Sequence, residues 1–321
     1  MKKLALRLGI MAALMVALTA CGGKSEGNTA SAPATPSSTL AAGTKVVKYL
    51  DKEYELPAST ERIVITGAVE AMEDSIVLDV NPIGAISFSG GFPPMFSSIT
   101  KNAESIGEKT EPNFEKILSL KPDVILGSTK FKPEVVEQLN KIAPTIPYSH
   151  VSSNWEANLT LLGELSGKKD KADQAIKEYK DDLTKVKSEL GEKLNGKKVV
   201  TLRIRQGKIN IYPEAVFFNP ILYSDLGLPV PAEIKAAKAQ EELSIEKFAE
   251  INPDIMFVQF SPDENKDTPN ALESIQNNPI FKNVGAVKNG QAFVNIVDPL
   301  AQGGTAYSKI EFLKALVSKL K

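Results

Sequence analysis

The residues best suited to chemistry in this 321-residue chain are basic side chains near the ends of segments with the apolar pattern of buried strands. They are Lys109, Lys130, Arg203, Arg205 and Lys238. On a strand, Arg203 and Arg205 point to the same face, where their charges repel, and such a pair indicates an anionic guest. Taken singly, Lys109 and Lys238 are typical of solvated surface charges. The set therefore predicts an anion site only if all five residues converge.

The counts of metal-binding side chains are low. The chain holds one cysteine, Cys21, and one histidine, His150. This excludes a disulfide within the chain and the usual zinc site, which needs several such ligands. For His150 we expect a structural hydrogen-bonding role in preference to ligand contact. The formal net charge of −1 argues against general affinity for nucleic acid or anionic membranes, so an anion site must be a local group of cations.

A ferric chelate fits this combination of grouped cations and missing metal ligands. A ferric triscatecholate carries three negative charges, and its siderophore already fills the coordination positions of the iron. The protein then needs neither a metal ligand nor a cofactor. Each pair of unit charges at ~6 Å is worth about 2–3 kcal/mol at an effective dielectric near ~20, before desolvation. A hydroxamate complex is neutral or weakly charged and does not call for such a set.

An internal repeat predicts the elements that position these cations. Residues 113–126 align without a gap to residues 244–257. In each copy an N-cap residue, Asn113 or Ser244, opens a short amphipathic helix, a Pro-Asp pair ends it, and an apolar run of strand length follows. The repeated unit predicts two similar α/β lobes. In open α/β sheets ligands lie beyond the carboxyl ends of the strands.

A long helix is predicted between the two copies. Apolar residues recur at alternating steps of four and three from Ala172 to Leu190, with Lys, Asp and Glu between them. We expect two Rossmann-like lobes with central parallel sheets, residues 45–167 and 195–321, joined by one long helix over residues 168–194. An ordinary surface helix within one domain is the alternative.

The first twenty residues suggest a role for Cys21, the single cysteine of the chain. A basic start precedes the uncharged apolar run 8–20, which is too short for a membrane span and is typical of a secretory signal. The run ends in a lipobox-like Leu-Thr-Ala-Cys, which predicts a signal peptide over 1–20 and lipid on Cys21. A plain signal peptide with an incidental cysteine is the alternative. Residues 21–44 are predicted to be a flexible tether, so the protein would touch the extracellular face of the cell membrane only through its lipid.

A family resemblance runs from about Tyr49 to the end of the chain. The segments that carry it are 86–90, 128–131, 152–155, 203–207, 236–240, 258–261 and 298–305. In these segments the chain resembles the Feu-type iron-uptake binding lipoproteins, the bacillibactin receptors of Gram-positive bacteria. These belong to the class III, or helical-backbone, solute-binding proteins. The resemblance implies a class III periplasmic-binding fold whose basic cleft between two lobes takes ferric bacillibactin and enterobactin-like siderophores.

The resemblance also implies roles for single residues. A basic triad that contacts the ferric triscatecholate falls on Lys109, Lys130 and Arg205. Further polar contacts fall on Arg203, Gln206, Lys238 and Gln240. One departure from the family is Gly91, which stands where the family commonly has lysine. We expect this difference to change the rim of the pocket and not the contacts named above.

Partners follow from the same resemblance. Each lobe presents one exposed glutamate to an arginine pocket on the ABC permease, which works with an associated ATPase. These glutamates fall on Glu115 and Glu246, equivalent positions in the two repeat copies. Two anions, one per lobe, suit a two-fold-symmetric partner, and both also favour the helix N-terminus through its dipole. We expect a monomer that delivers its ligand to this importer, with no nucleic-acid partner.

Two other functions stay open at this point. One is a receptor for a different ferric chelate, such as citrate or a mixed-ligand siderophore. The other is a surface-anchored serine hydrolase, because Ser166 and Lys169 fit an S-x-x-K pattern. That pattern lacks its K-T-G partner, and no G-x-S-x-G elbow occurs. We therefore expect a binding protein and not an enzyme.

Overall fold

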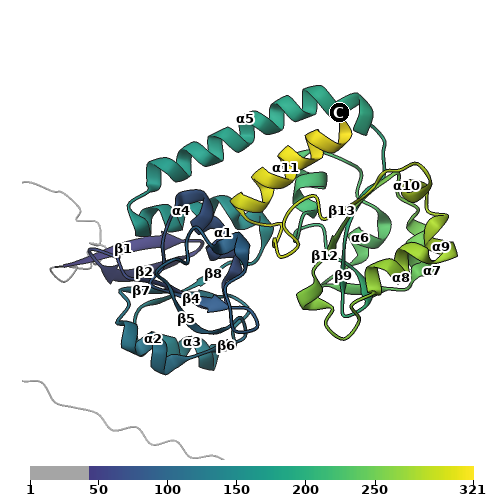
Figure 1. The fold of residues 1–321 in the computed structure, drawn as a ribbon. Coiled ribbons are helices and arrows are strands. Elements are labelled where there is room, and N and C mark those ends of the chain that lie inside the picture. The colour runs from purple at the N-terminus through teal and green to yellow at the C-terminus, as the bar shows by residue number, and fades with distance from the viewer. Residues whose placement is uncertain (1–42) are drawn as a thin grey trace, which may run out of the picture. The chain divides into compact units, whose positions relative to one another are not determined.

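The structure is a computed structural model that describes residues 43–321. The predicted signal peptide, Cys21 and nearly all of the predicted tether lie outside these residues. The described part holds a six-stranded sheet and a five-stranded sheet with flanking helices, besides a two-stranded hairpin, and a long helix lies between the two larger sheets in the chain (Figure 1). No helix within residues 43–321 is long and apolar enough to cross a membrane.

The N-terminal lobe is built on a six-stranded sheet with strand order β6-β5-β4-β3-β7-β8. Its strands are β3 (Ile63–Ile65), β4 (Gly84–Ser87), β5 (Glu104–Glu108), β6 (Glu111–Pro112), β7 (Val124–Ser128) and β8 (Thr145–Tyr148). All neighbours are parallel except β5 and β6. The helices are α1 (Val69–Leu78), α2 (Phe114–Leu120), α3 (Pro133–Asn140) and α4 (Trp155–Ser166), with short turns at Pro94–Phe96 and Ser152–Asn154. An antiparallel hairpin of β1 (Thr44–Tyr49) and β2 (Lys52–Pro57) precedes the sheet.

The C-terminal lobe is built on a five-stranded sheet with strand order β11-β10-β9-β12-β13. Its strands are β9 (Val199–Arg205), β10 (Lys208–Ile211), β11 (Glu241–Leu243), β12 (Ile255–Phe260) and β13 (Ala292–Val294). Only β9, β12 and β13 are parallel, so the predicted parallel core is extended here by an antiparallel edge. The helical segments are Ile221–Asp225, α6 (Ala232–Ala236), α7 (Ile245–Ile251), Pro262–Glu264, α8 (Ala271–Asn277), α9 (Pro279–Lys282) and α10 (Gly285–Lys288).

The sequence repeat has the same structure in both lobes. The side chains of Asn113 and Ser244 accept from the third helical N–H of α2 and α7, which satisfies one of the free donors at each helix start. After each helix, an aspartate accepts the backbone N–H that precedes the neighbouring strand. These bonds are Arg62 N–H to Asp123 Oδ2 and Lys198 N–H to Asp254 Oδ2, each 2.8 Å. The Pro-Asp pair therefore fixes each helix to the start of β3 or β9.

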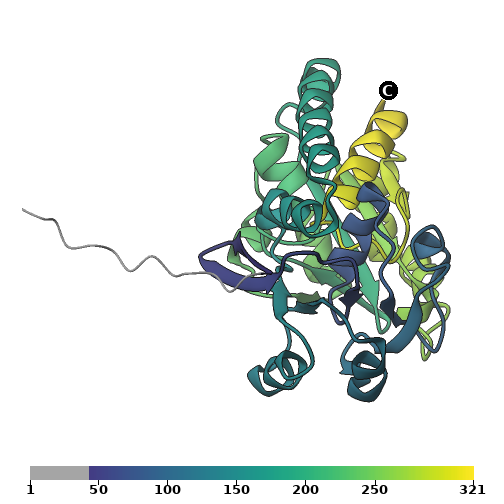
Figure 2. The same cartoon turned by 90° about the vertical axis from the view of Figure 1, so that its left-hand side faces the viewer.

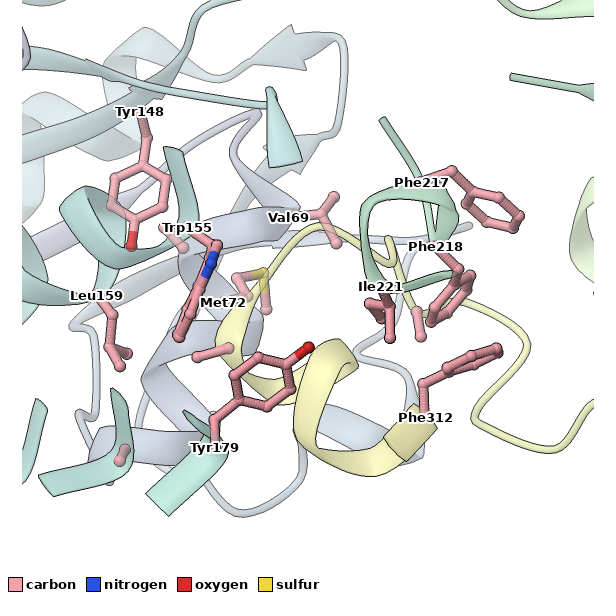
Figure 3. Close-up of a cluster of buried hydrophobic side chains, with 14 of the residues drawn as sticks. Val69, Met72, Tyr148, Trp155, Leu159, Tyr179, Phe217, Phe218, Ile221 and Phe312 are labelled. Carbon is pink, nitrogen blue, oxygen red and sulfur yellow. The ribbon is translucent and has the colours of Figure 1, made fainter. Parts of the chain in front are cut away.

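The predicted linker helix is present as α5 (Lys169–Leu194), and it buries Ala172, Tyr179, Val186 and Leu190 of the predicted stripe. It packs against α1, α4 and the last helix, α11 (Ala306–Leu320). Figures 1 and 2 show α11 beside α5. Phe312 of α11 also stacks on Phe218 of the C-terminal lobe, with ring centroids 4.8 Å apart (Figure 3). Two helices, and not α5 alone, therefore run along the junction of the lobes.

A buried lysine lies where α4, α5 and α11 meet. Lys309 is 1% exposed, and its Nζ lies 2.5 Å from Asp225 Oδ2. The Nζ is also 5.4 Å from the ring centroid of Trp155 and 5.2 Å from that of Tyr179. Figure 3 shows these two rings close to each other. The Tyr179 hydroxyl donates to the same carboxylate oxygen at 2.7 Å. A buried ammonium is tolerated here because one carboxylate and two aromatic faces replace its water.

We predict that Asp225→Ala lowers the free energy of unfolding by about 3–5 kcal/mol, because it leaves the Lys309 ammonium buried and unpaired. Lys309→Met removes the charge and fills the same space, so it should cost less than half as much. Urea unfolding followed by circular dichroism measures both. An equal or larger loss in Lys309→Met would contradict this account of the junction.

Candidate ligand-binding site

The first two cations lie at the carboxyl edge of the N-terminal sheet. Lys109 follows β5 directly, and Lys130 lies two residues beyond β7. The backbone N–H of Lys130 donates to Ser128 Oγ at 3.1 Å, which shapes the turn. Its Nζ lies 3.3 Å from the Oε1 of Glu70, a 4% exposed residue in the first turn of α1. Glu70 and Lys130 follow the neighbouring strands β3 and β7, and Lys109 follows β5 at the same edge of the sheet, with β4 between β5 and β3.

Lys109 experiences charges from both lobes. Burial lowers the pKa of Lys109 to about 8, Glu70 opposes this shift, and Lys130, Arg203 and Arg205 add to it. Lys109 Nζ also donates to Gln302 Oε1 at 3.4 Å, a residue in the segment between β13 and α11. The structure therefore places Lys130, Arg203 and Arg205 within electrostatic reach of Lys109. Within residues 43–321 there is no group of three or more His, Cys, Asp and Glu side chains that could hold a metal ion.

The arginine pair lies on β9, whose last residue is Arg205. Arg203 Nε lies 2.6 Å from Glu264 Oε2, and Arg205 Nε lies 3.5 Å from Glu264 Oε1. The Glu264 carboxylate thus bridges the two guanidinium groups and offsets part of their repulsion. The Arg203 guanidinium also lies 6.0 Å from the ring centroid of Phe217.

Of the three further residues expected at the site, only Gln240 contacts one of the arginines. Gln240 Oε1 accepts from Arg205 Nη1 at 3.3 Å and from the Tyr212 hydroxyl at 3.1 Å. Gln206 is exposed in the two-residue turn between β9 and β10, with φ of +49°. Lys238 is exposed, and its backbone N–H donates to Glu241. No ion pair or hydrogen bond within residues 43–321 ties the Lys238 ammonium to the other four cations, so its convergence stays a prediction.

His150 lies beyond β8, next to the lysines of the N-terminal lobe. Its Nδ1 is 2.7 Å from Thr129 Oγ1, and its backbone N–H donates to the same oxygen at 3.3 Å. Burial lowers the pKa of His150, Lys130 lowers it further, and Glu70 opposes both. A neutral ring that ties two strand ends together matches the structural role expected from the sequence.

Three residues of this site were not found from the sequence: Glu70, Glu264 and Gln302. Each lies far along the chain from the cation it contacts, so no local spacing connects them. The one available signal is position: Glu70 follows the strand-like run before it by a few residues, in the first turn of a helix at the strand's carboxyl end. Such positions face the ligand edge of an α/β sheet.

Gly91 lies in the loop that follows β4, where its backbone pairs with Phe88. A Cβ built on Gly91 meets nothing within 4 Å, so a longer side chain fits there without displacing a neighbour. In the same loop, Ser89 Oγ accepts from Lys266 Nζ of the C-terminal lobe at 2.5 Å. This rim therefore carries a direct contact between the lobes.

The two glutamates predicted for docking are both exposed. Glu115 lies in the first turn of α2 and Glu246 in the first turn of α7. By contrast, Ser166 and Lys169 do not form a catalytic pair. The Ser166 hydroxyl donates to the Leu162 carbonyl at 2.6 Å, and Lys169 pairs with Asp173 at 2.7 Å.

Comparisons with known proteins agree with this arrangement. The chain is 53% identical over 322 residues to the iron-uptake system-binding protein of Bacillus subtilis, covering 100% of this chain and 99% of that protein. It is 30% identical over 260 residues to the probable siderophore-binding lipoprotein YfiY of the same organism, covering 78% and 79%. Among solved structures, the B. subtilis triscatecholate siderophore binding protein FeuA complexed with ferri-bacillibactin matches with 56% identity and a TM-score of 0.83, covering 86% and 98%. The sequence pattern of periplasmic binding proteins matches residues 95–295. With α/β lobes on either side of a long helix and this match over more than half of its length, the chain belongs to the periplasmic binding protein family.

Proposed function

We propose that this protein captures ferric triscatecholate siderophores, bacillibactin first and enterobactin-like ones next, and delivers them to an ABC importer. The observation that carries the proposal is that Lys109 lies within electrostatic reach of Lys130 in its own lobe and of Arg203 and Arg205 in the other. The crystallised B. subtilis relative holds ferri-bacillibactin. The proposed contact set is Lys109, Lys130, Arg203, Arg205, Gln206, Lys238 and Gln240.

The charge of the site supports a trianion. The four cations that converge stand beside two carboxylates, Glu70 and Glu264, which leaves a formal excess of two positive charges. The exposed Lys238 would bring a third charge if its flexible side chain folded over the ligand. Three positive charges match the three negative charges of a ferric triscatecholate. Arginine and lysine side chains also pack well against catecholate rings.

The cellular arrangement is proposed from the sequence. A signal peptide over residues 1–20 is removed, Cys21 carries lipid, and residues 21–44 form the tether on the extracellular face of the membrane. Residues 45–167 and 195–321 form the two lobes around the helix 168–194. Glu115 and Glu246 dock a monomer onto the permease and its ATPase, and the protein itself catalyses no reaction.

The direct test is a titration of the protein that lacks residues 1–21 with ferric bacillibactin. We expect saturable quenching of Trp155 fluorescence at micromolar ligand or below, because ferric catecholates absorb where tryptophan emits. Ferric citrate and a ferric hydroxamate serve as competitors, and a large excess of each should displace little ligand. Absence of saturable quenching would overturn the proposed function, and displacement by citrate at equal concentration would assign the site to a different chelate.

Removing single cations should weaken binding. We expect Lys130→Ala and Arg205→Ala each to raise the Kd more than ~10-fold, because each deletes a charge that faces the ligand. Lys132→Ala and Lys208→Ala are matched controls, since both lysines are exposed and lie two or three residues from the tested positions. Equal Kd values for the test and control variants would contradict the assigned site.

Docking should be separable from capture. Glu115→Ala and Glu246→Ala are expected to leave the Kd for ferric bacillibactin unchanged and to reduce uptake of 55Fe-bacillibactin by cells at least about fivefold. Glu250→Ala, which removes another exposed carboxylate from α7, is the control. Normal uptake in the double variant Glu115→Ala/Glu246→Ala would refute the docking role.

A further inference from the structure

Phe217 has a backbone conformation that bulky residues rarely adopt. Its φ is +61°, in the left-handed region that glycine and asparagine favour, and the residue is buried. Such a conformation is unfavourable, persists only where surrounding contacts impose it, and is more common at functional sites than elsewhere. The groups that hold this backbone and the groups that contact its ring therefore indicate what the strain is for.

Two segments outside its own loop hold the backbone of Phe217. Ser152, in the short turn after β8 of the N-terminal lobe, donates its hydroxyl to the Phe217 carbonyl at 3.2 Å, and this bond is buried. Gly303, in the segment before α11, packs so closely that a Cβ added to it would collide with the Phe217 carbonyl carbon. Gly304 leaves similar space for Ser152, because a Cβ added there would collide with the Ser152 hydroxyl. A side chain of the other lobe and a pair of glycines therefore fix this one peptide.

The loop that carries Phe217 packs over the face of β9 from which Arg203 projects. Thr201 and Arg203 are two residues apart on this strand, so their side chains point to the same face. Thr201 Oγ1 donates to Asn219 Oδ1 at 2.7 Å, and Asn219 Nδ2 donates to the Tyr212 carbonyl at 2.8 Å. Both ends of the loop are thereby tied to β9 beside the arginine.

The ring of Phe217 contacts two groups of the ligand site. The Arg203 guanidinium lies over this ring at 6.0 Å from its centroid, and the Tyr212 ring lies 4.6 Å away. The Tyr212 hydroxyl in turn donates to Gln240 at 3.1 Å. Arg203 is buried, so the direction of its guanidinium is set by its neighbours, which are the Glu264 carboxylate on one nitrogen and the phenyl ring on its face.

Further aromatic rings restrict the movement of Phe217. Its ring centroid lies 4.7 Å from that of Phe218, and Phe218 stacks on Phe312 of α11. Figure 3 shows these three side chains one after another. A ring packed in this way changes its position when its backbone moves, so the contacts of the backbone control the contacts of the ring.

We propose that Phe217 is a positioning residue for Arg203, and that the contact between the lobes at Ser152 keeps the phenyl ring against the guanidinium. This inference rests on the proposed function, in which Arg203 contacts the siderophore. When the Ser152 hydroxyl is removed, the strained backbone of Phe217 relaxes and its ring leaves the arginine. The orientation of a cation in one lobe thus depends on a hydroxyl of the other lobe, although neither Ser152 nor Phe217 contacts the ligand.

The first test observes the arginine itself and needs no siderophore. The Nε–H proton of Arg203 gives an NMR signal, because its bond to Glu264 slows exchange with water, and this signal is the one missing in Arg203→Lys. The ring current of Phe217 displaces the signal. We expect it to move in Phe217→Leu, which keeps an apolar side chain without the aromatic face, and to move in the same direction in Ser152→Ala. An unchanged signal in Ser152→Ala would overturn the inference.

Calorimetric titration with ferric bacillibactin measures the consequence for binding. Phe217→Leu is expected to raise the Kd about fivefold and Ser152→Ala about threefold, because each loosens the guanidinium without deleting its charge. As controls, Phe248→Leu removes a buried phenyl ring elsewhere in the C-terminal lobe, and Ser149→Ala removes a buried hydroxyl that is bonded within its own lobe. Both controls should bind like wild type, and equal Kd values in test and control variants would contradict the positioning role.

A double-mutant cycle distinguishes positioning of the arginine from a general loosening of the junction. In the Arg203→Lys background the oriented guanidinium is gone, so adding Ser152→Ala should no longer raise the Kd. The same threefold loss in both backgrounds would show that Ser152 acts on the ligand site by another route, which overturns the inference.

The strained backbone has a test of its own. Phe217→Gly and Phe217→Ala both delete the ring and should raise the Kd equally, but glycine tolerates a positive φ and alanine does not. Phe217→Gly should therefore unfold at a higher urea concentration than Phe217→Ala. The reverse order would contradict a strained backbone at this position, and with it the need for Ser152 to hold it.

These outcomes separate the inference from the proposed function. Wild type that fails to bind ferric bacillibactin overturns the proposed function, and the Arg203 signal still decides whether Phe217 and Ser152 position that side chain. Wild type that binds, with Phe217→Leu binding equally well, overturns only the inference. If the Phe217 variants do not fold, the Arg203 signal in Ser152→Ala and the cycle between Ser152→Ala and Arg203→Lys decide the question without them.

Discussion

The structure depends on keeping several like charges close together in a partly buried site before any ligand is present. Four cations from two lobes would repel one another and lose hydration if left alone. One carboxylate in each lobe offsets this repulsion. Glu70 pairs with Lys130 in the N-terminal lobe, and Glu264 pairs with Arg203 and Arg205 in the C-terminal lobe. The ligand then meets cations that are already oriented, which reduces the entropy lost on binding.

Helix α1 connects this constraint to the rest of the fold. Its first turn carries Glu70, and its next residues on the inner side, Glu73 and Asp74, hold the start of α11. Glu73 accepts from the backbone of Gln302 at 2.7 Å and from the hydroxyls of Thr305 and Ser308, and Asp74 accepts from Ala306 N–H at 2.9 Å. Through Gln302 this network reaches back to Lys109. One helix therefore organises both the site and the attachment of the last element.

The local features of the chain could be predicted from its sequence, and the distant partners could not. The repeat gave both capped helices and the strands after them, because caps, Pro-Asp turns and apolar runs are short-range signals. The long helix followed from its periodicity.

The sequence placed Arg203 and Arg205 at the end of a strand, but it could not show that they share Glu264, which lies some sixty residues further along the chain. The antiparallel edge of the second sheet was not predicted, because β10 and β11 are only four and three residues long and pair across about thirty residues of sequence. The position of Lys238 depends on a flexible, exposed side chain, which no pattern specifies.

Lys309 gives the molecule an optical property that is separate from its chemistry. The chain has a single tryptophan, and a full positive charge lies 5.4 Å from the centre of its indole ring, contributed by a different helix. The electric field of such a charge shifts the indole emission wavelength by an amount that decreases with distance and depends on the direction of the field relative to the ring. A rotation of α11 relative to α4 would move this charge and so shift the emission wavelength of Trp155, which makes the tryptophan a reporter of movement at the junction of the lobes.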